Sequence, residues 1–106
     1  MDLATAVYDV AKHLPPTERF ELSAQMRRAA LSVPSNVAEG HANRFSPKTY
    51  AKHVRIALGS LAELDSDLEL AVRLKFIDTT SVVHVFDRVA RTGQLLHGVL
   101  RSLRRR

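Results

Sequence analysis

Residues 27–40 read Arg27-Arg28-Ala29-Ala30-Leu31-Ser32-Val33-Pro34-Ser35-Asn36-Val37-Ala38-Glu39-Gly40. The pattern is helical on both sides of the proline, with small residues along it. Pro34 has no N–H to donate to the carbonyl of Ala30, and its ring crowds that carbonyl, so we expect the helix to kink there. Ser32, Asn36 and Glu39 lie within reach of the disturbed turn. We predict that they satisfy the freed backbone groups or bond across a subunit contact, with a polar pocket as the alternative.

The length and composition of the chain predict one domain, covering residues 1–106. A chain of 106 residues with 45% apolar residues has enough material for one modest core. No apolar run approaches the about 20 residues that a membrane-spanning helix needs, and the first five residues do not resemble a signal peptide. We therefore expect a cytoplasmic protein with no membrane partner. The absence of cysteine excludes disulfides and thiolate metal sites.

Helix start and stop signals divide the chain into four segments. Asp2 and Thr17 are expected N-caps, Pro15-Pro16 ends the first segment, and Ser46-Pro47 is a strong start signal. The next cap is Asp78, Thr79 or Thr80. We predict helices at about residues 2–14, 17–42, 47–73 and 79–103.

Apolar residues recur at spacings of three and four in each of the longer segments, and no segment alternates with the period of a strand. Ile56, Leu58 and Leu70 widen the stripe of the third segment, so we expect that helix to contact neighbours on more than one side. Together the pattern predicts an all-α protein, an antiparallel up-and-down four-helix bundle. The predicted buried stripes are Leu22, Met26, Ala29, Val33 and Val37; Tyr50, Val54, Ala57, Leu61, Leu64, Leu68 and Ala71; and Val82, Phe86, Val89, Gly93, Leu96, Leu100 and Leu103.

Two motifs within residues 18–78 resemble a known family. They are Arg28-Ala29-Ala30-x-Ser32-Val33-Pro34-x-Asn36-Val37-Ala38-Glu39-Gly40 and Ile56-Ala57-Leu58-Gly59-Ser60-Leu61-x-Glu63-Leu64. In this order they resemble the small four-helix-bundle proteins encoded in intervening sequences of bacterial 23S rRNA genes. They are similar, more distantly, to the accessory protein of diversity-generating retroelements.

The resemblance implies a four-helix bundle that assembles into a homo-oligomeric ring, most often a pentamer. The retroelement relatives imply a basic surface that binds nucleic acid, whereas the activity of the intervening-sequence proteins is not established. This chain departs from the pattern in its short first helix, which lacks an aromatic-rich extension, and in its arginine-rich tail. It also has Lys75-Phe76 where the family tends to have Gly-Tyr, which removes a natural left-handed cap.

The motif residues have a structural interpretation that we favour over a functional one. Gly59 in mid-helix costs about 1 kcal/mol relative to alanine, and close approach of another helix would offset that cost. The residues that we assign to this structural motif are Arg28, Ser32, Pro34, Asn36, Glu39, Gly40, Gly59, Ser60 and Glu63.

The net charge of +5 is concentrated in the last segment, because residues 79–106 hold six arginines against Asp87 alone. Arginines at a helix C-terminus interact favourably with the helix dipole, but four exceed that need. In a ring they would form a continuous basic band that binds phosphate backbones without sequence preference. The predicted nucleic-acid-binding residues are Lys48, Lys52, Arg55, Arg101, Arg104, Arg105 and Arg106. Phe45, Tyr50 and Phe76 are the aromatic residues near loops, too few to predict a single-strand stacking platform.

No pattern in the chain predicts an enzyme, a cofactor, a metal site or a small-molecule substrate. The five histidines do not have metal-ligand spacing. Glu63, Asp65, Asp67 and Glu69 cannot all face one direction on a helix, although Glu63 and Asp67, four positions apart, are a close like-charge pair. Pairing with arginines of another helix or subunit is their expected use. Arg91 and His97 have a spacing that resembles a motif in helical-bundle ribonucleases. In a chain with twelve arginines and five histidines, one such spacing is expected by chance.

We therefore expect a non-enzymatic homo-oligomer that binds RNA or DNA. The alternatives are a protein–protein scaffold and, as a distant third, a helical-bundle ribonuclease.

Overall fold

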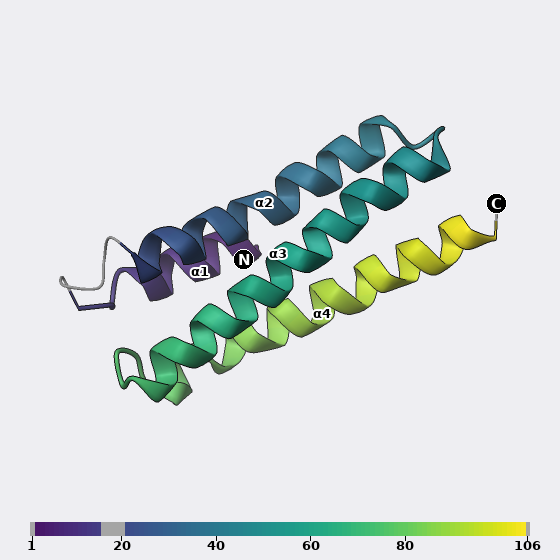
Figure 1. The fold of residues 1–106 in the computed structure, drawn as a ribbon. Coiled ribbons are helices and arrows are strands. Elements are labelled where there is room, and N and C mark those ends of the chain that lie inside the picture. The colour runs from purple at the N-terminus through teal and green to yellow at the C-terminus, as the bar shows by residue number, and fades with distance from the viewer. Residues whose placement is uncertain (1, 16–20, 106) are drawn as a thin grey trace.

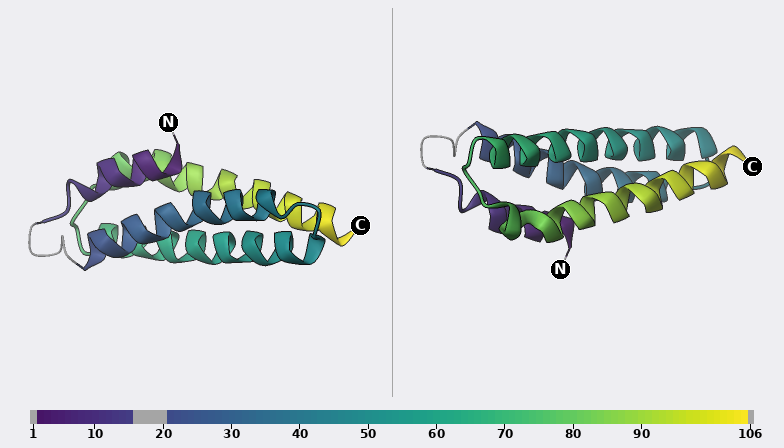
Figure 2. Two further views of the ribbon diagram at one scale, coloured as in Figure 1. Left: turned by 90° about the horizontal axis from the view of Figure 1, so that it is seen from above. Right: turned by 90° about the horizontal axis from the view of Figure 1, so that it is seen from below.

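The computed structural model describes residues 2–15 and 21–105, and over these residues it is all-α, with four helices and no strand. The helices are α1 (Leu3–Ala11), α2 (Leu22–Ala42), α3 (Pro47–Arg73) and α4 (Thr79–Arg104). They form an elongated four-helix bundle of 47 × 23 × 21 Å. As Figure 1 shows, α2 and α3 lie side by side, and α4 returns along α3 to the end of the molecule where α3 begins. The short α1, of nine residues, packs against α2 and α4 and runs along only part of their length (Figure 2).

Two of the predicted helix starts are confirmed by cap hydrogen bonds. The Asp2 carboxylate accepts the backbone N–H of Thr5 at 2.9 Å, and this bond holds the pKa of Asp2 below its usual value. The Ser46 hydroxyl oxygen accepts the N–H of Thr49 at 3.4 Å, with Pro47 at the first helical position. Asp78, one of the three residues expected there, is the N-cap residue of α4, but its side chain makes no cap hydrogen bond and instead accepts the Thr80 hydroxyl at 3.0 Å. The expected cap at Thr17 lies outside the described residues.

The first helix is shorter than predicted, ending at Ala11 rather than Leu14. The N–H groups of His13 and Leu14 bond to the carbonyls three residues before them, so the chain tightens into turns. Pro15 disfavours helical geometry only for Leu14, the residue before it, so it bounds the helix without setting its last residue. Leu14 is nevertheless buried in the core.

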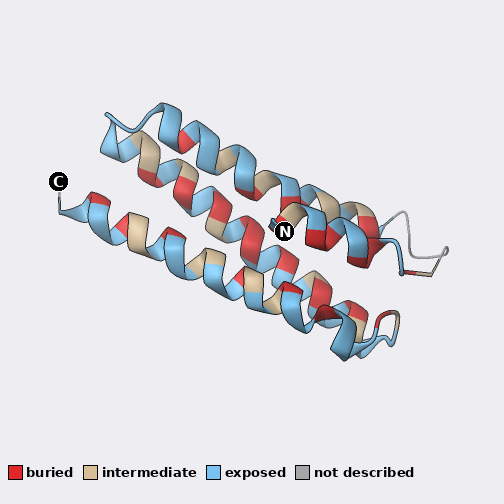
Figure 3. Cartoon of the chain, turned by 180° about the vertical axis from the view of Figure 1, so that it is seen from behind, coloured by how far each residue is buried: buried red, intermediate tan, exposed pale blue. Residues whose placement is uncertain are grey.

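The core follows the predicted stripes with one correction on α2. Figure 3 shows buried positions along the inward sides of the helices, and Met26, Ala57, Leu64 and Val82 are fully buried. Val37, however, is 37% exposed, while Asn36 and Gly40 face α3 in its place. The stripe therefore steps from Val33 to residues 36 and 40 rather than to 37.

The wide stripe of α3 faces α2 on one side and α4 on the other, as predicted. Ile56 and Leu70, which widen the stripe, remain 41% and 46% exposed. Among the described helices, none combines the length and apolar character that crossing a membrane requires.

The loop after α3 keeps its left-handed cap although glycine is missing. Lys75 has a φ of 63°, and its N–H bonds to the carbonyl of Val72. The next N–H, of Phe76, bonds to the carbonyl of Ala71 at 2.9 Å. These two bonds are those of a Schellman motif, so this departure from the family pattern changes a side chain and leaves the turn intact.

Candidate nucleic-acid interface

The fold brings the two predicted groups of cations to one end of the molecule. Lys48, Lys52 and Arg55 lie in the first part of α3, and Arg101, Arg104 and Arg105 lie in the last turns of α4. Because α3 begins at the end of the molecule where α4 ends, residues about fifty positions apart in the sequence lie at the same end (Figures 1 and 2). All six side chains are exposed. We call these six residues the basic end; Arg106 lies outside the described residues.

The positive charge of the basic end is not neutralised by neighbouring carboxylates. Among the described residues, none of the six cations forms an ion pair; the three ion pairs found are Lys12–Asp9, Arg73–Glu69 and Arg91–Asp87. Within residues 36–58 and 95–105, which make up this part of the bundle, Glu39 is the single acid. The acidic run starts at Glu63, about 12 Å along α3 from Arg55 and about 22 Å from Lys48, and both distances exceed the screening length of about 8 Å at physiological salt.

Helix stability explains only part of this arrangement. Arg104 and Arg105 lie at the C-terminus of α4, where the helix dipole favours positive charge. Lys48 lies in the first turn of α3, where the dipole disfavours a cation by about 0.3–1 kcal/mol. That turn holds no acid that would pair with Lys48, so the helix dipole does not account for its charge.

The α2–α3 loop adds an exposed aromatic ring to the basic end. Phe45 is 87% exposed, and the guanidinium carbon of Arg44 lies 4.7 Å from the centre of its ring. Tyr50 and Phe76, the other two aromatic candidates, are half-buried against the core.

The family-motif residues form a polar network between α2 and α3. The Ser60 hydroxyl donates to the Ser32 hydroxyl at 2.7 Å, and the Asn36 amide donates to the same oxygen at 3.1 Å. His53 Nδ1 lies 3.0 Å from Asn36 Oδ1. The Ser60–Ser32 and His53–Asn36 bonds join α3 to α2, which agrees with the structural interpretation of Ser32, Asn36 and Ser60.

The polar residues around Pro34 do not make the hydrogen bonds to the freed backbone groups that the sequence predicts. The helix α2 continues through Pro34, which is exposed. The Asn36 amide bonds to the carbonyl of Ser32 at 2.9 Å and not to that of Ala30, which the proline leaves free. Glu39 is exposed, and it contributes its backbone carbonyl to the Asn43 amide. The polar side chains thus connect helices instead of satisfying the freed carbonyl.

The two motif glycines have opposite surroundings. A Cβ on Gly40 would lie 2.9 Å from Cδ1 of Tyr50, so this glycine allows the ring to pack against α2. A Cβ on Gly59 would meet nothing within 4 Å. The close helix approach expected at Gly59 is therefore absent within the subunit.

A cleft of about 490 Å³ lies beside the polar network and contains further motif residues. Arg28 and Glu63 line it, with Ser32 and Ser60 and with Gln25, Ala29 and Asp67. Burial, and secondly the neighbouring Glu63 carboxylate, raises the pKa of Asp67 above its usual value. Among the described residues, no cation forms an ion pair with Glu63 or Asp67.

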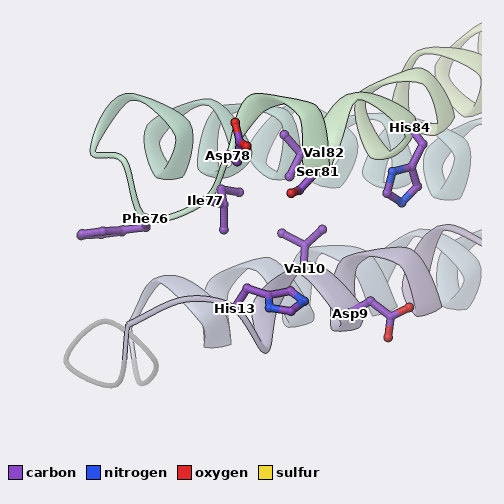
Figure 4. A pocket seen from close by; sticks show the side chains of 9 residues that line it. All are labelled: Asp9, Val10, His13, Phe76, Ile77, Asp78, Ser81, Val82 and His84. Atoms are coloured by element: carbon purple, nitrogen blue, oxygen red, sulfur yellow. The ribbon is translucent and has the colours of Figure 1, made fainter.

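A second cavity, of about 360 Å³, lies at the opposite end of the molecule from the basic end, between α1 and the start of α4. Figure 4 shows His13 and His84 pointing into it from the two sides, over an apolar lining that includes Val10, Ile77 and Val82. In the described part of the chain, no group of three or more metal-ligating side chains is brought together.

Arg91 and His97 are not brought together in one cavity. Arg91 is paired with Asp87 at 3.0 Å, whereas His97 lines a groove between α3 and α4 from which Arg91 is absent.

Comparison with known proteins places the sequence in a family. No curated protein matches the chain. The family model described as 23S rRNA-intervening sequence protein matches residues 1–98, which include both motifs and all four helices up to the last turns of α4. The chain therefore belongs to the 23S rRNA-intervening sequence protein family.

Proposed function

We propose that this protein is a non-enzymatic, cytoplasmic homo-oligomer that binds the sugar–phosphate backbone of RNA or DNA through its basic end. The observation that carries the proposal is the gathering of six exposed cations, unpaired among the described residues, at one end of the bundle. Lysine and arginine side chains that contact phosphates release counterions, and this release drives binding that does not depend on sequence.

The proposed assembly is a ring of antiparallel up-and-down bundles, with the pentamer that the family resemblance implies. Its support in the subunit is the exposed apolar surface of α3 and α4, where Ile56, Leu70 and Leu95 are 41%, 46% and 73% exposed. Gly59, with open space around it, leaves room for another subunit to approach α3 closely. A ring repeats the basic end in every subunit and so multiplies a modest patch. The same apolar surface favours a protein–protein scaffold as the second candidate function.

The test of nucleic-acid binding is the dependence of affinity on salt. The slope of log K against log salt should be about 0.7 to 0.9 times the number of phosphates neutralised. Replacing Arg101, Arg104, Arg105 and Arg106 by glutamine should weaken binding to all sequences about equally and flatten the slope. The matched control replaces four cations that lie outside the basic end, Lys12, Arg73, Lys75 and Arg91, by glutamine and should leave the slope unchanged. Undetectable binding at about 50 mM salt, or equal effects of the two sets, would overturn the proposal.

The assembly is tested separately by light scattering. A mass near the subunit value of 11.8 kDa at micromolar concentration would exclude the ring. The glutamine variant should keep the mass of the parent protein, because the substituted side chains are exposed or lie beyond Leu103, the last buried residue of α4.

A further inference from the structure

Phe45 is the most exposed large apolar residue among those that the structure describes, at 87%. A single exposed apolar side chain is common on protein surfaces and has no meaning by itself. Phe45 differs from Leu70 and Leu95 because it is aromatic and has a guanidinium group over its ring. Tyr8 is also aromatic and has the Arg27 guanidinium over its ring, but it is 38% exposed against 87% for Phe45.

The loop that carries Phe45 is held by hydrogen bonds to the last turn of α2. The Asn43 amide donates to the carbonyl of Glu39 at 2.8 Å, and Arg44 donates to the carbonyl of His41 through its backbone N–H and its side chain, both at 3.1 Å. The N–H of Ser46 then closes the turn on the carbonyl of Asn43. The ring is therefore presented from a defined turn, and little conformational entropy is lost when a ligand contacts it.

The surroundings of the ring are positively charged. Lys48 follows three residues later in the first turn of α3, and Lys52 lies one turn further along. The position thus combines an open aromatic face, a stacked arginine and nearby cations that bind phosphates. Aromatic faces and arginine planes stack on unpaired bases, while cations follow the backbone.

We propose that Phe45, supported by Arg44, is a stacking platform for an unpaired nucleobase, so that the basic end prefers single-stranded to double-stranded nucleic acid. The inference rests on the proposed function, and it adds the class of nucleic acid to it. Bases in a duplex are already stacked, and a ring at the tip of a short loop reaches one only after the base has been flipped out. A single strand offers its bases without that cost.

The experiment measures the affinity of the full chain for oligonucleotides of about 12 nucleotides, using dT and rU single strands and a DNA duplex. Phe45→Ala should weaken binding of both single strands by about 5- to 100-fold and leave duplex binding unchanged. Comparison of dT with rU shows whether the platform accepts DNA, RNA or both. Val83→Ala is the matched control: Val83 is 57% exposed but lies at the start of α4, away from the basic end, and its replacement should change neither affinity.

A second variant reports stacking directly. The chain has no tryptophan, so Phe45→Trp introduces a single indole at the platform. It should retain the affinity for single strands, and its fluorescence should be quenched by them and not by the duplex.

Distinct results would overturn the inference and the proposed function. If Phe45→Ala leaves single-strand affinity unchanged, or weakens duplex and single strand equally, the platform is excluded while backbone binding stands. A smaller oligomeric mass for Phe45→Ala would also exclude the stacking platform, because the Phe45 side chain would then pack at a contact between subunits. If the unmodified protein binds none of the three nucleic acids, both the platform and the proposed function fail.

Discussion

The hydroxyl of Ser60 donates a 2.7 Å hydrogen bond to the hydroxyl of Ser32, 28 positions earlier in the chain. Ser60 is 8% exposed, and Ser32 also accepts the amide of Asn36. A buried hydroxyl that loses its partner costs about 1–3 kcal/mol, more than a hydrogen bond contributes when both partners are removed together.

Replacement of Ser32 should therefore destabilise the protein more than replacement of Ser60. Ser32→Ala leaves the buried Ser60 hydroxyl unpaired, whereas Ser60→Ala leaves Ser32 with its bond from Asn36. We expect losses of about 1–3 and about 1 kcal/mol, and the double variant should lose at least about 0.5 kcal/mol less than the sum. Denaturant unfolding of the four proteins measures this coupling, and the cycle cancels the better helix propensity of alanine. Strict additivity would mean that the bond does not join α2 to α3 in solution.

Alanine should have opposite effects at the two motif glycines. Gly40→Ala places a Cβ 2.9 Å from the Tyr50 ring, and the resulting overpacking should cost about 1–3 kcal/mol despite the better helix propensity. Gly59→Ala meets nothing in the subunit and should stabilise the isolated bundle by about 1 kcal/mol. Melting curves at low concentration compare the two variants. Stabilisation by both would show that Tyr50 moves aside freely, and a loss of oligomeric mass in Gly59→Ala alone would place a subunit contact at that glycine.

Lys75→Gly should stabilise the protein by about 1 kcal/mol. Lysine at a φ of 63° brings its Cβ close to the backbone, and glycine removes that strain while the two hydrogen bonds of the turn remain. Lys75→Ala is the control, since it removes the charge but keeps a Cβ and should give no gain. Equal melting temperatures for the glycine and alanine variants would indicate that the left-handed conformation carries no strain here.

Asp67→Asn should stabilise the protein near neutral pH and not in acid. The folded state raises the pKa of Asp67 above 3.8, so ionisation is harder in the folded chain than in the unfolded one. The contribution of Asp67 to stability is therefore intact below about pH 3.8 and is lost as the pH rises through the folded pKa. Unfolding of parent and variant should differ at about pH 7 and converge near pH 3.

Glu63→Gln provides the comparison for Asp67. Glu63→Gln should stabilise the protein less than Asp67→Asn does, because burial raises the pKa of Asp67 more than the Glu63 charge does. A loss of stability in Asp67→Asn at neutral pH would reveal a cation bound to this carboxylate, such as an arginine of another subunit.

The starts and the apolar faces of the helices depend mostly on residues that are close together in the sequence, so they can be predicted from it. The cap at Ser46, the proline after it, and the apolar spacing of Val54, Leu61 and Leu68 act over one or two turns, and the structure begins and buries α3 as they predict. The end of α1 was predicted three residues too late, since two prolines mark a boundary without showing how the preceding turn tightens. The family resemblance is also a sequence property, and the match over residues 1–98 confirms it.

The sequence by itself determined the four helices, their apolar stripes and the two separate groups of cations. The predicted antiparallel order already places Lys48 and Arg101 at one end of the molecule, and only the tertiary structure decided that the described cations there are exposed and form no ion pair. The tertiary structure also decided that Asn36, rather than Val37, faces α3. It decided as well that Phe45 is exposed while Tyr50 packs on Gly40. Apolar periodicity predicts the face of a helix on which a residue lies only to within about one position in a turn of about four residues. Which neighbouring helix covers that residue is set by contacts between residues far apart in the chain.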